Sequence, residues 1–215
     1  GAKLHKGLEE DVYPAAASIE LFHAFTLVHD DIMDAAETRR GYPSVYKKWG
    51  SNEAILAGDF LFSASLAELS KLARYLSFQN VLGEFARACF EVCVGQSWDL
   101  YLHTPSLNHY FNLIYLKTAS LIRASLLIGG LLGRDICRVY EIQELGINTG
   151  FLFQIYDDFI DVFREEKETG KTTLSDIKNR KYSFPVILLL SECDYHDKQN
   201  FLNTCLLYTS DAADE

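Results

Sequence analysis

The sequence predicts an all-α protein with a single domain. Apolar residues recur at helical spacing over long segments, and only 4 prolines interrupt the 215 residues. No segment shows the alternation of apolar and polar residues, or the enrichment in β-branched residues, that is typical of a strand. With 48% hydrophobic residues, a chain of this length can bury one substantial core.

The expected helices are the helix-periodic segments that lie between turn signals. Of six expected helices, the first (about 12–36) and the fifth (about 136–166) contain apolar runs, at residues 25–29 and 151–156. The fourth (about 107–133) contains the longest apolar stretch, Leu121–Gly133. The first and the fifth end before loops at residues 39–43 and 167–171, where glycine occurs with proline or with charge. The helical period between the remaining turn signals defines the other three. We expect helices at about residues 12–36, 52–72, 79–102, 107–133, 136–166 and 183–203.

Composition excludes several classes of function. The net charge of −10 argues against nucleic acid or an anionic membrane surface as the main partner. The 5 cysteines are an odd number and indicate no disulfide framework. Cys89 and Cys93 have no second pair of cysteines or histidines that would complete a zinc site. Leu121–Gly133 contains Arg123 and is too short to span a bilayer. We therefore expect a soluble, cytoplasmic protein without a signal peptide or transmembrane segment.

Two acidic clusters with the pattern Asp-Asp-x-x-Asp carry most of the functional information. Each follows an apolar run, and its first and last aspartates fall on one helix face about one turn apart. Like charges at this spacing destabilise a helix unless a cation lies between them. Carboxylate oxygens suit Mg²⁺, which takes one or two of them and fills its other positions with water and substrate phosphate. We therefore predict metal-bridged phosphate chemistry at Asp30, Asp31, Asp34, Asp157, Asp158 and Asp161.

Basic residues follow the first cluster closely. Arg39 and Arg40 lie a few residues after Asp34, and Lys47 and Lys48 come next. These cations can be salt partners of the aspartates. Alternatively, they are counter-ions for a diphosphate, for which the arginine side chain offers two parallel hydrogen bonds. The recurrence of the acidic pattern far along the chain favours the second interpretation, because a solvated surface helix does not require it.

The order of these motifs resembles the trans-isoprenyl diphosphate synthases of the polyprenyl synthetase family. The segments 22–34 and 150–161 resemble the two aspartate-rich motifs of that family. Between and after them, further matches occur in the same order: Arg39-Arg40-Gly41, Gly95-Gln96, Tyr115-Leu116-Lys117-Thr118-Ala119, Gly170-Lys171, Asp176-Ile177 and Lys181. The resemblance covers roughly residues 10 to 200 and is specific because both acidic motifs occur together with the intervening basic elements.

The resemblance implies an isoprenoid synthase-type helical bundle around a central cavity. The implied reaction is the head-to-tail condensation of isopentenyl diphosphate with an allylic diphosphate, with Mg²⁺ as the cofactor and Mn²⁺ as a second candidate. It also implies a homodimer for the full-length protein and short products, such as farnesyl or geranylgeranyl diphosphate. The implied roles are ligation of the metal by the six aspartates, binding of diphosphates by His23, Arg39, Arg40, Lys171 and Lys181, catalysis at Lys117, Thr118 and Gln154, and control of product length by Phe22, Phe25 and Thr26.

Some of these residues have simpler interpretations. His23 can be a hydrogen-bonded core histidine, Gln154 can bond a neighbouring helix, and Lys181 is one of several basic residues in its segment. Helix geometry places Thr26 and His23 beneath the aspartates and Phe25 to the side, so the role of Phe25 rests on the family alone. A buried lysine such as Lys117 requires an anion.

Two other functions remain as alternatives to the synthase. A class I terpene cyclase shares the fold and the first motif, but its second metal site normally has another pattern. A non-catalytic subunit of a prenyl synthase heteromer would have lost aspartates, whereas all six are present here.

Both ends of the sequence depart from the family pattern. The family has a basic Gly-Lys-Arg-type segment before the first motif, which Gly1-Ala2-Lys3 does not match, and its last helices have no counterpart. We therefore expect residues 1–204 to be a fragment of a polyprenyl synthetase domain with little activity of its own. Residues 205–215 resemble a translated sequencing adapter, and a natural acidic tail is the alternative.

Overall fold

The computed structural model describes residues 9–75, 77–102, 104–133, 138–163, 174–178, 181–201 and 203. Almost all of these residues are helical, which confirms the predicted all-α class. The helices are α1 (Glu9–Met33), α2 (Val45–Trp49), α3 (Ser51–Ser70), α4 (Phe78–Tyr101), α5 (Leu107–Ile114), α6 (Ser120–Leu132), α7 (Val139–Phe163), α9 (Ser175–Lys178), α10 (Phe184–Glu192) and α11 (Tyr195–Phe201). A 3-10 turn, η2 (Lys71–Arg74), follows α3, and a π-helical turn, η3 (Tyr115–Ala119), joins α5 to α6.

The structure differs from the prediction in several places. The first helix ends at Met33 instead of at about residue 36, and the short helices α2 and α9 and the π-helical turn η3 were not predicted. The expected loop at residues 39–43 is a small hairpin of β1 (Thr38–Arg39) and β2 (Tyr42–Pro43). Its two turn residues, Arg40 and Gly41, both have positive φ angles, which fits the twist of a tight hairpin. The expected helix at 183–203 is divided into α10 and α11, because the carboxylate of Asp194 accepts a hydrogen bond from the backbone N–H of Asp197 and starts a new helix. The expected loop at 167–171 lies outside the described residues.

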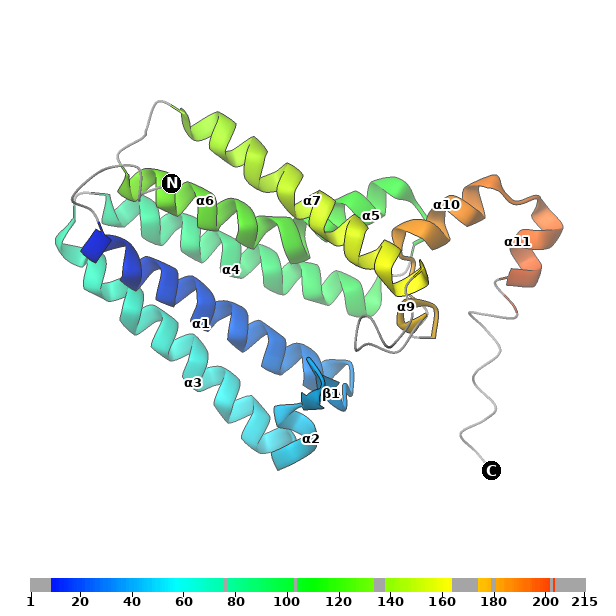
Figure 1. Cartoon of the computed structure of the whole chain (residues 1–215), viewed down its shortest axis with the longest axis horizontal. Coiled ribbons are helices and arrows are strands. Elements are labelled where there is room, and N and C mark those ends of the chain that lie inside the picture. The colour runs from blue at the N-terminus through cyan, green and yellow to red at the C-terminus, as the bar shows by residue number, and fades with distance from the viewer. Residues whose placement is uncertain are drawn as a thin grey trace.

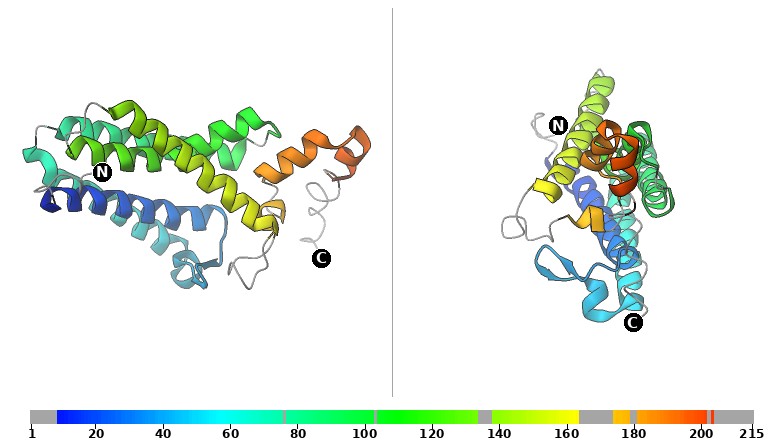
Figure 2. Two further views of the ribbon diagram at one scale, coloured as in Figure 1. Left: turned by 45° about the horizontal axis from the view of Figure 1, so that its top comes forward. Right: turned by 90° about the vertical axis from the view of Figure 1, so that its right-hand side faces the viewer.

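The long helices α1, α3, α4, α6 and α7 run side by side along the long axis of the molecule, and α10 and α11 lie at one end (Figure 1). Further views of the same bundle show α7 crossing over α6 (Figure 2). Direct contacts join α1 to α3, α4 to α6, and α6 to α7. The first aspartate-rich motif ends α1 and the second ends α7, so the bundle brings the ends of two distant helices to the same region.

An aromatic cluster holds α1, α3 and α4 together. Phe22 is 1% exposed, and its ring lies 5.5 Å from Phe25, 6.0 Å from Phe62 and 5.7 Å from Phe85, measured between ring centroids. Burial of one such side chain stabilises the fold by about 1.5–3 kcal/mol. This cluster therefore fixes how α1 is rotated about its axis, and the same rotation sets the direction in which Asp30 points.

Among the described residues, one helical run, Leu107–Leu132, is long and apolar enough to span a membrane by length and composition. It is longer than the apolar stretch Leu121–Gly133 because the helix continues back through η3 into α5. The run packs against α4 and α7. Its buried Arg123 forms ion pairs with Glu84 at 3.0 Å and Glu91 at 2.8 Å. Both glutamates belong to α4, so these ion pairs attach the run to that helix of the bundle.

Candidate functional site

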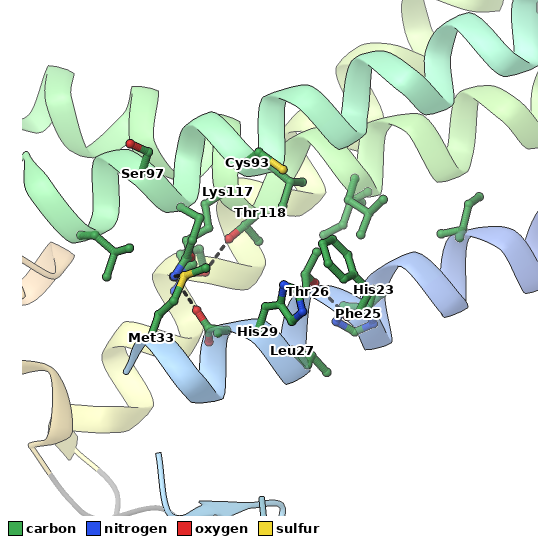
Figure 3. A pocket seen from close by; sticks show the side chains of 18 of the residues that line it. His23, Phe25, Thr26, Leu27, His29, Met33, Cys93, Ser97, Lys117 and Thr118 are labelled. Carbon is green, nitrogen blue, oxygen red and sulfur yellow. Dashed lines mark hydrogen bonds and ion pairs between the residues drawn. The ribbon is translucent and has the colours of Figure 1, made fainter. Parts of the chain in front are cut away.

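A pocket of about 640 Å³ lies between α1, α4, α6 and α7. Figure 3 shows Lys117, Thr118 and Met33 toward one end of it and His23 and Phe25 toward the other. The end near Lys117 is polar, because Asp30 and Gln154 also line it. The other walls are mainly apolar, with Ile19, Val92, Leu121 and Ile122 among the lining residues. The pocket thus combines a charged end, called the mouth below, with mainly apolar walls elsewhere.

In the first aspartate cluster, Arg39 is the partner of two aspartates. Its Nη2 lies 2.6 Å from Oδ1 of Asp31 and 3.4 Å from Oδ2 of Asp30. Burial works against the charge of Arg39, but the hydrogen bond and the charge of Asp31, with those of Asp30, outweigh burial and raise the pKa of the guanidinium. Arg39 therefore holds the end of α1 and its hairpin together, as a salt partner would.

Lys117 and Lys181 converge on a carboxylate that sequence reasoning missed. Nζ of Lys117 lies 2.5 Å from Oδ2 of Asp99, and Nζ of Lys181 lies 3.0 Å from the same oxygen. Each lysine also reaches the first cluster at 3.4 Å, Lys117 at Asp30 and Lys181 at Asp34. The prediction that Lys117 needs an anion is thus confirmed, and the anion is Asp99 together with Asp30.

The pKa values in this group follow from burial and pairing. Burial disfavours the charge of Asp99, but Lys117 and Lys181 outweigh it and lower the pKa of this carboxyl. Burial also opposes the charge of Lys181, whose pKa is nevertheless raised by Asp99 and Asp34. For Asp34 burial prevails over the attraction of Lys181, and its pKa is raised.

A signal for Asp99 was present in the sequence. Asp99 follows Gly95 by four residues, so both lie on the face of α4 that packs against η3. The family match Gly95-Gln96 ends three residues before Asp99. The amide of Gln96 contacts the sulfur of Met33 at 3.6 Å.

In the second cluster, Asp158 is bound by protein hydrogen-bond donors. It is 4% exposed and accepts hydrogen bonds from Tyr110 Oη at 2.7 Å, Gln154 Nε2 at 2.9 Å and the backbone N–H of Phe184 at 2.9 Å. Burial raises its pKa, although these hydrogen bonds oppose the shift. Asp158 therefore joins α7 to α5 and α10.

Asp157 and Asp161 flank Asp158 on α7 and are half-buried. The backbone N–H of Asp176 donates to Oδ2 of Asp161 at 3.1 Å, so the segment of α9 is attached to this end of α7. Burial, with the charges of Asp161 and Asp158, raises the pKa of Asp176 to about 7. Negative charge is thus concentrated at the ends of α1 and α7.

The π-helical turn η3 presents two consecutive residues to the pocket. Lys117 points to Asp99 and Asp30, while the hydroxyl of Thr118 donates to Oε1 of Gln154 at 2.8 Å. Gln154 in turn donates to Asp158. The three predicted catalytic residues, Lys117, Thr118 and Gln154, therefore lie close together. Gln154 also makes a hydrogen bond to a neighbouring element, as its simpler interpretation predicted.

The predicted length-controlling residues occupy different places. Phe25 and Thr26 line the pocket, whereas Phe22 lies behind Phe25 in the aromatic cluster and does not line it. The hydroxyl of Thr26 donates to the backbone oxygen of His23 at 2.8 Å, one turn earlier. His23 also lines the pocket, with Glu20 at 4.0 Å. Phe22 thus touches the pocket only through Phe25.

Among the described residues, the predicted diphosphate ligands Arg39, Arg40 and Lys181 do not line the pocket. Arg40 is exposed at the tip of the hairpin and makes no hydrogen bond or ion pair with the described part of the chain. Lys171 lies outside the described residues. Within the described ranges, no three acidic, histidine or cysteine side chains converge closely enough to hold a metal ion by themselves.

Comparison with known proteins gives consistent matches. The family model described as Polyprenyl synthetase matches residues 2–214. A short chain isoprenyl diphosphate synthase from Methanocaldococcus jannaschii is 37% identical over 90% of this chain and 60% of its own. A geranylgeranyl diphosphate synthase from Methanosarcina mazei is 41% identical over 82% of this chain and 56% of its own. The chain thus spans about 60% of the length of the curated relatives it matches.

The solved structures agree with the sequence matches. The crystal structure of geranylgeranyl pyrophosphate synthetase from Pyrococcus horikoshii has a TM-score of 0.81 at 40% identity, covering 88% of this chain and 60% of that one. The octaprenyl pyrophosphate synthase from Helicobacter pylori has a TM-score of 0.83 at 26% identity, covering 94% of this chain and 65% of that one. The bundle is therefore similar to that of synthases whose named products differ in length.

Proposed function

The chain belongs to the polyprenyl synthetase family, and on this premise we propose that the whole protein is a prenyltransferase. It condenses isopentenyl diphosphate head-to-tail with an allylic diphosphate, releases pyrophosphate and gives a short-chain trans-polyprenyl diphosphate. The relatives named above as short chain and geranylgeranyl synthases support this product class.

One observation carries the proposal: a pocket with a charged mouth and mainly apolar walls elsewhere. Lys117 and Asp30 line the polar end, and side chains such as Val92 and Leu121 line the rest. An allylic diphosphate has the matching form, an anionic head on an apolar tail. A volume of about 640 Å³ is within the usual range for a small-molecule site.

The lysines are the proposed ligands of the diphosphate. Lys117 and Lys181 lie 2.5 and 3.0 Å from Oδ2 of Asp99, which keeps both cations at the mouth of the pocket. A diphosphate offers more negative charge than one carboxylate, so it can draw both ammonium groups toward itself. In this proposal Asp99 holds the two lysines near the position of the substrate before it arrives.

The residues at the mouth fit a bound Mg²⁺. Asp30 on α1, Asp34 just after the end of α1, and Asp157 on α7 supply carboxylate oxygens, which are the ligands that Mg²⁺ prefers. Mg²⁺ needs only one or two carboxylates, because substrate phosphate and water would complete its shell. Bound there, the ion would neutralise charge on the diphosphate as its bond to the allylic carbon breaks.

The remaining residues orient the tail and exclude water. Thr118 and Gln154 place a hydroxyl and an amide oxygen at the wall of the pocket, where their dipoles can stabilise positive charge on the allylic carbons. The apolar walls keep water from that carbon. Phe25, supported from behind by Phe22, narrows the pocket and is the proposed limit on the length of the tail.

The test is a direct assay of the whole protein with Mg²⁺, labelled isopentenyl diphosphate and, separately, dimethylallyl, geranyl and farnesyl diphosphate. We expect labelled farnesyl or geranylgeranyl diphosphate. Asp30→Asn and Asp157→Asn should each lower turnover by several orders of magnitude while the helical circular dichroism is retained, because each removes a proposed metal ligand. Asp59→Asn, an exposed aspartate on α3, is the matched control.

The same assay separates the alternatives. A cyclic hydrocarbon formed from an allylic diphosphate alone would indicate a terpene cyclase. Product formed only after a second, different subunit is added, and unaffected by Asp30→Asn, would indicate a non-catalytic subunit. Normal turnover of both aspartate variants at saturating Mg²⁺ would contradict the metal assignment.

A further inference from the structure

The turn η3 lies between two glycines on neighbouring helices. Gly95 on α4 faces Lys117 and Leu116, and Gly150 on α7 faces Ala119. A π-helical turn is rare and is frequently found at a functional site. Figure 3 shows two residues of this turn, Lys117 and Thr118, beside the pocket.

At Gly95 the approach is between backbones. A Cβ atom added at this position would lie 2.7 Å from the carbonyl carbon of Leu116 and from Cα of Lys117, and closer still to the backbone nitrogen of Lys117. Backbone atoms cannot rotate away as the end of a side chain can. One helical turn after Gly95, on the same face of α4, Asp99 accepts a hydrogen bond from the ammonium group of Lys117.

Gly150 repeats this arrangement on the opposite side. A Cβ atom there would come closer than 3.0 Å to both Cα and Cβ of Ala119. One turn after Gly150, on the same face of α7, the side-chain oxygen of Gln154 accepts a hydrogen bond from the hydroxyl of Thr118. Each helix therefore supplies a glycine that admits the turn and, four residues later, an acceptor for one of its side chains.

We propose that Gly95 and Gly150 are positioning residues that fix η3, so that Lys117 and Thr118 reach their acceptors and the pocket at the same time. Glycine is a poor helix former, and at Gly95 and Gly150 its lack of a side chain admits the close approach of η3. What the two positioned side chains do for a diphosphate rests on the function proposed above. A methyl group at either glycine should move the turn away from its acceptor.

The chain supplies matched control glycines. Gly83 lies on α4 with nothing within 4 Å of an added Cβ atom. Gly146 lies on α7, one turn before Gly150, and an added Cβ atom would lie 2.5 Å from Cα of Arg123. Gly146→Ala therefore disturbs the packing of α6 against α7 without touching η3.

The first experiment needs no ligand. In the full chain, the coupling between Lys117 and Asp99 is measured by a double-mutant cycle, from the shifts in thermal unfolding midpoint caused by Lys117→Met, Asp99→Asn and both together. We expect the coupling to be present in the parent and in Gly83→Ala, and to be lost in Gly95→Ala. A cycle of Thr118→Val with Gln154→Leu should lose its coupling in Gly150→Ala and keep it in Gly146→Ala.

The second experiment measures binding of inorganic pyrophosphate with Mg²⁺ by calorimetry. Gly95→Ala should weaken binding roughly tenfold, as expected for the loss of a charge-assisted hydrogen bond, and should add nothing in a Lys117→Met background. Gly146→Ala should lower the unfolding midpoint but leave the Kd unchanged.

The outcomes separate the two proposals. If the parent binds no pyrophosphate, the proposed function fails, while the coupling cycles still decide whether the glycines position the turn. Coupling that persists in both alanine variants would overturn the positioning role. Unfolding of Gly95→Ala and Gly150→Ala beside a folded Gly146→Ala would assign both glycines to packing alone and would also overturn it.

Discussion

Lys117 and Lys181 place their ammonium groups on the same atom, Oδ2 of Asp99, at 2.5 and 3.0 Å. One lysine comes from the turn η3 and the other from the segment before α10, so a single carboxylate joins two parts of the bundle that are distant in sequence. Two cations held this closely repel each other unless an anion lies between them. Asp99 therefore holds the two lysines together at the mouth of the pocket when no substrate is bound.

Asp99→Asn should reduce stability by about 2 kcal/mol, because it removes the charge from hydrogen bonds that both lysines donate. The pKa of Asp99 is lowered in the folded protein, so its contribution is present above the unfolded pKa of about 3.9 and is lost as the pH falls through the lower folded value. Urea unfolding from pH 7 down to pH 3 should thus show a shallower loss of stability in the variant.

The control for this prediction is Glu141→Gln, which changes an exposed carboxylate on α7. It should leave both the stability and its dependence on pH close to those of the parent. Equal acid sensitivity in Asp99→Asn and the parent would show that the two lysines do not depend on Asp99.

Tyr110→Phe should cost about 1.5–3 kcal/mol, because it removes a hydrogen bond to the buried carboxylate of Asp158 without replacing it. The matched control is Tyr140→Phe, a change of the same atom at an exposed position on α7. Chemical denaturation of both variants measures the difference. Equal stability of the two would mean that water replaces the lost donor and that Asp158 does not hold α5.

Phe22→Ala and Phe25→Ala should have different consequences, because only Phe25 lines the pocket. Phe22→Ala removes the centre of the aromatic cluster and should destabilise the fold by about 3–5 kcal/mol. Phe25→Ala should instead lengthen the prenyl product, as measured by chromatography of the dephosphorylated alcohols. A Phe22→Ala, Phe25→Ala double variant with the products of the parent would exclude both side chains from control of length.

Cys93 should react with a thiol reagent well before Cys89. Burial raises the pKa of the Cys89 thiol to about 12, so at pH 8 its thiolate is roughly three orders of magnitude scarcer than that of an ordinary cysteine. Burial also raises the pKa of the Cys93 thiol, but this cysteine is exposed and lines the pocket. Mass spectrometry after brief alkylation should find Cys93 modified first. Preferential modification of Cys89 would contradict its buried position.

The fold was predictable because its signals are local. Helical period and turn residues depend on neighbours in sequence, and α1 and α7 occupy segments where helices were predicted, although α1 ends at Met33, before Asp34. The break between α10 and α11 was missed because it depends on one hydrogen bond from the carboxylate of Asp194. The π-helical turn was missed for a similar reason, since it differs from an α-helix only in which hydrogen bonds close each turn.

The site was only partly predictable because its contacts join distant segments. The sequence indicated that Lys117 needs an anion, but not that Asp99 supplies it or that Lys181 shares it. It placed Phe22 and Phe25 together, whereas the orientation of α1 puts one in the core and the other at the pocket. Such details depend on how each helix is rotated against its neighbours.

The hydrogen bonds that run from Thr118 through Gln154 to Asp158 have a fixed direction. Gln154 must point its amide nitrogen toward the carboxylate of Asp158, which cannot donate when ionised, so its oxygen faces Thr118. The hydroxyl hydrogen of Thr118 is thereby committed to that oxygen. The lone pairs of the Thr118 hydroxyl oxygen remain available to the pocket. This part of the wall is therefore electron-rich. It favours an electron-poor carbon of a ligand over a ligand atom that is itself a hydrogen-bond acceptor. Reversing the amide would require Asp158 to take up a proton, and the protonation state of one buried carboxyl thus sets the polarity of a surface that it does not touch.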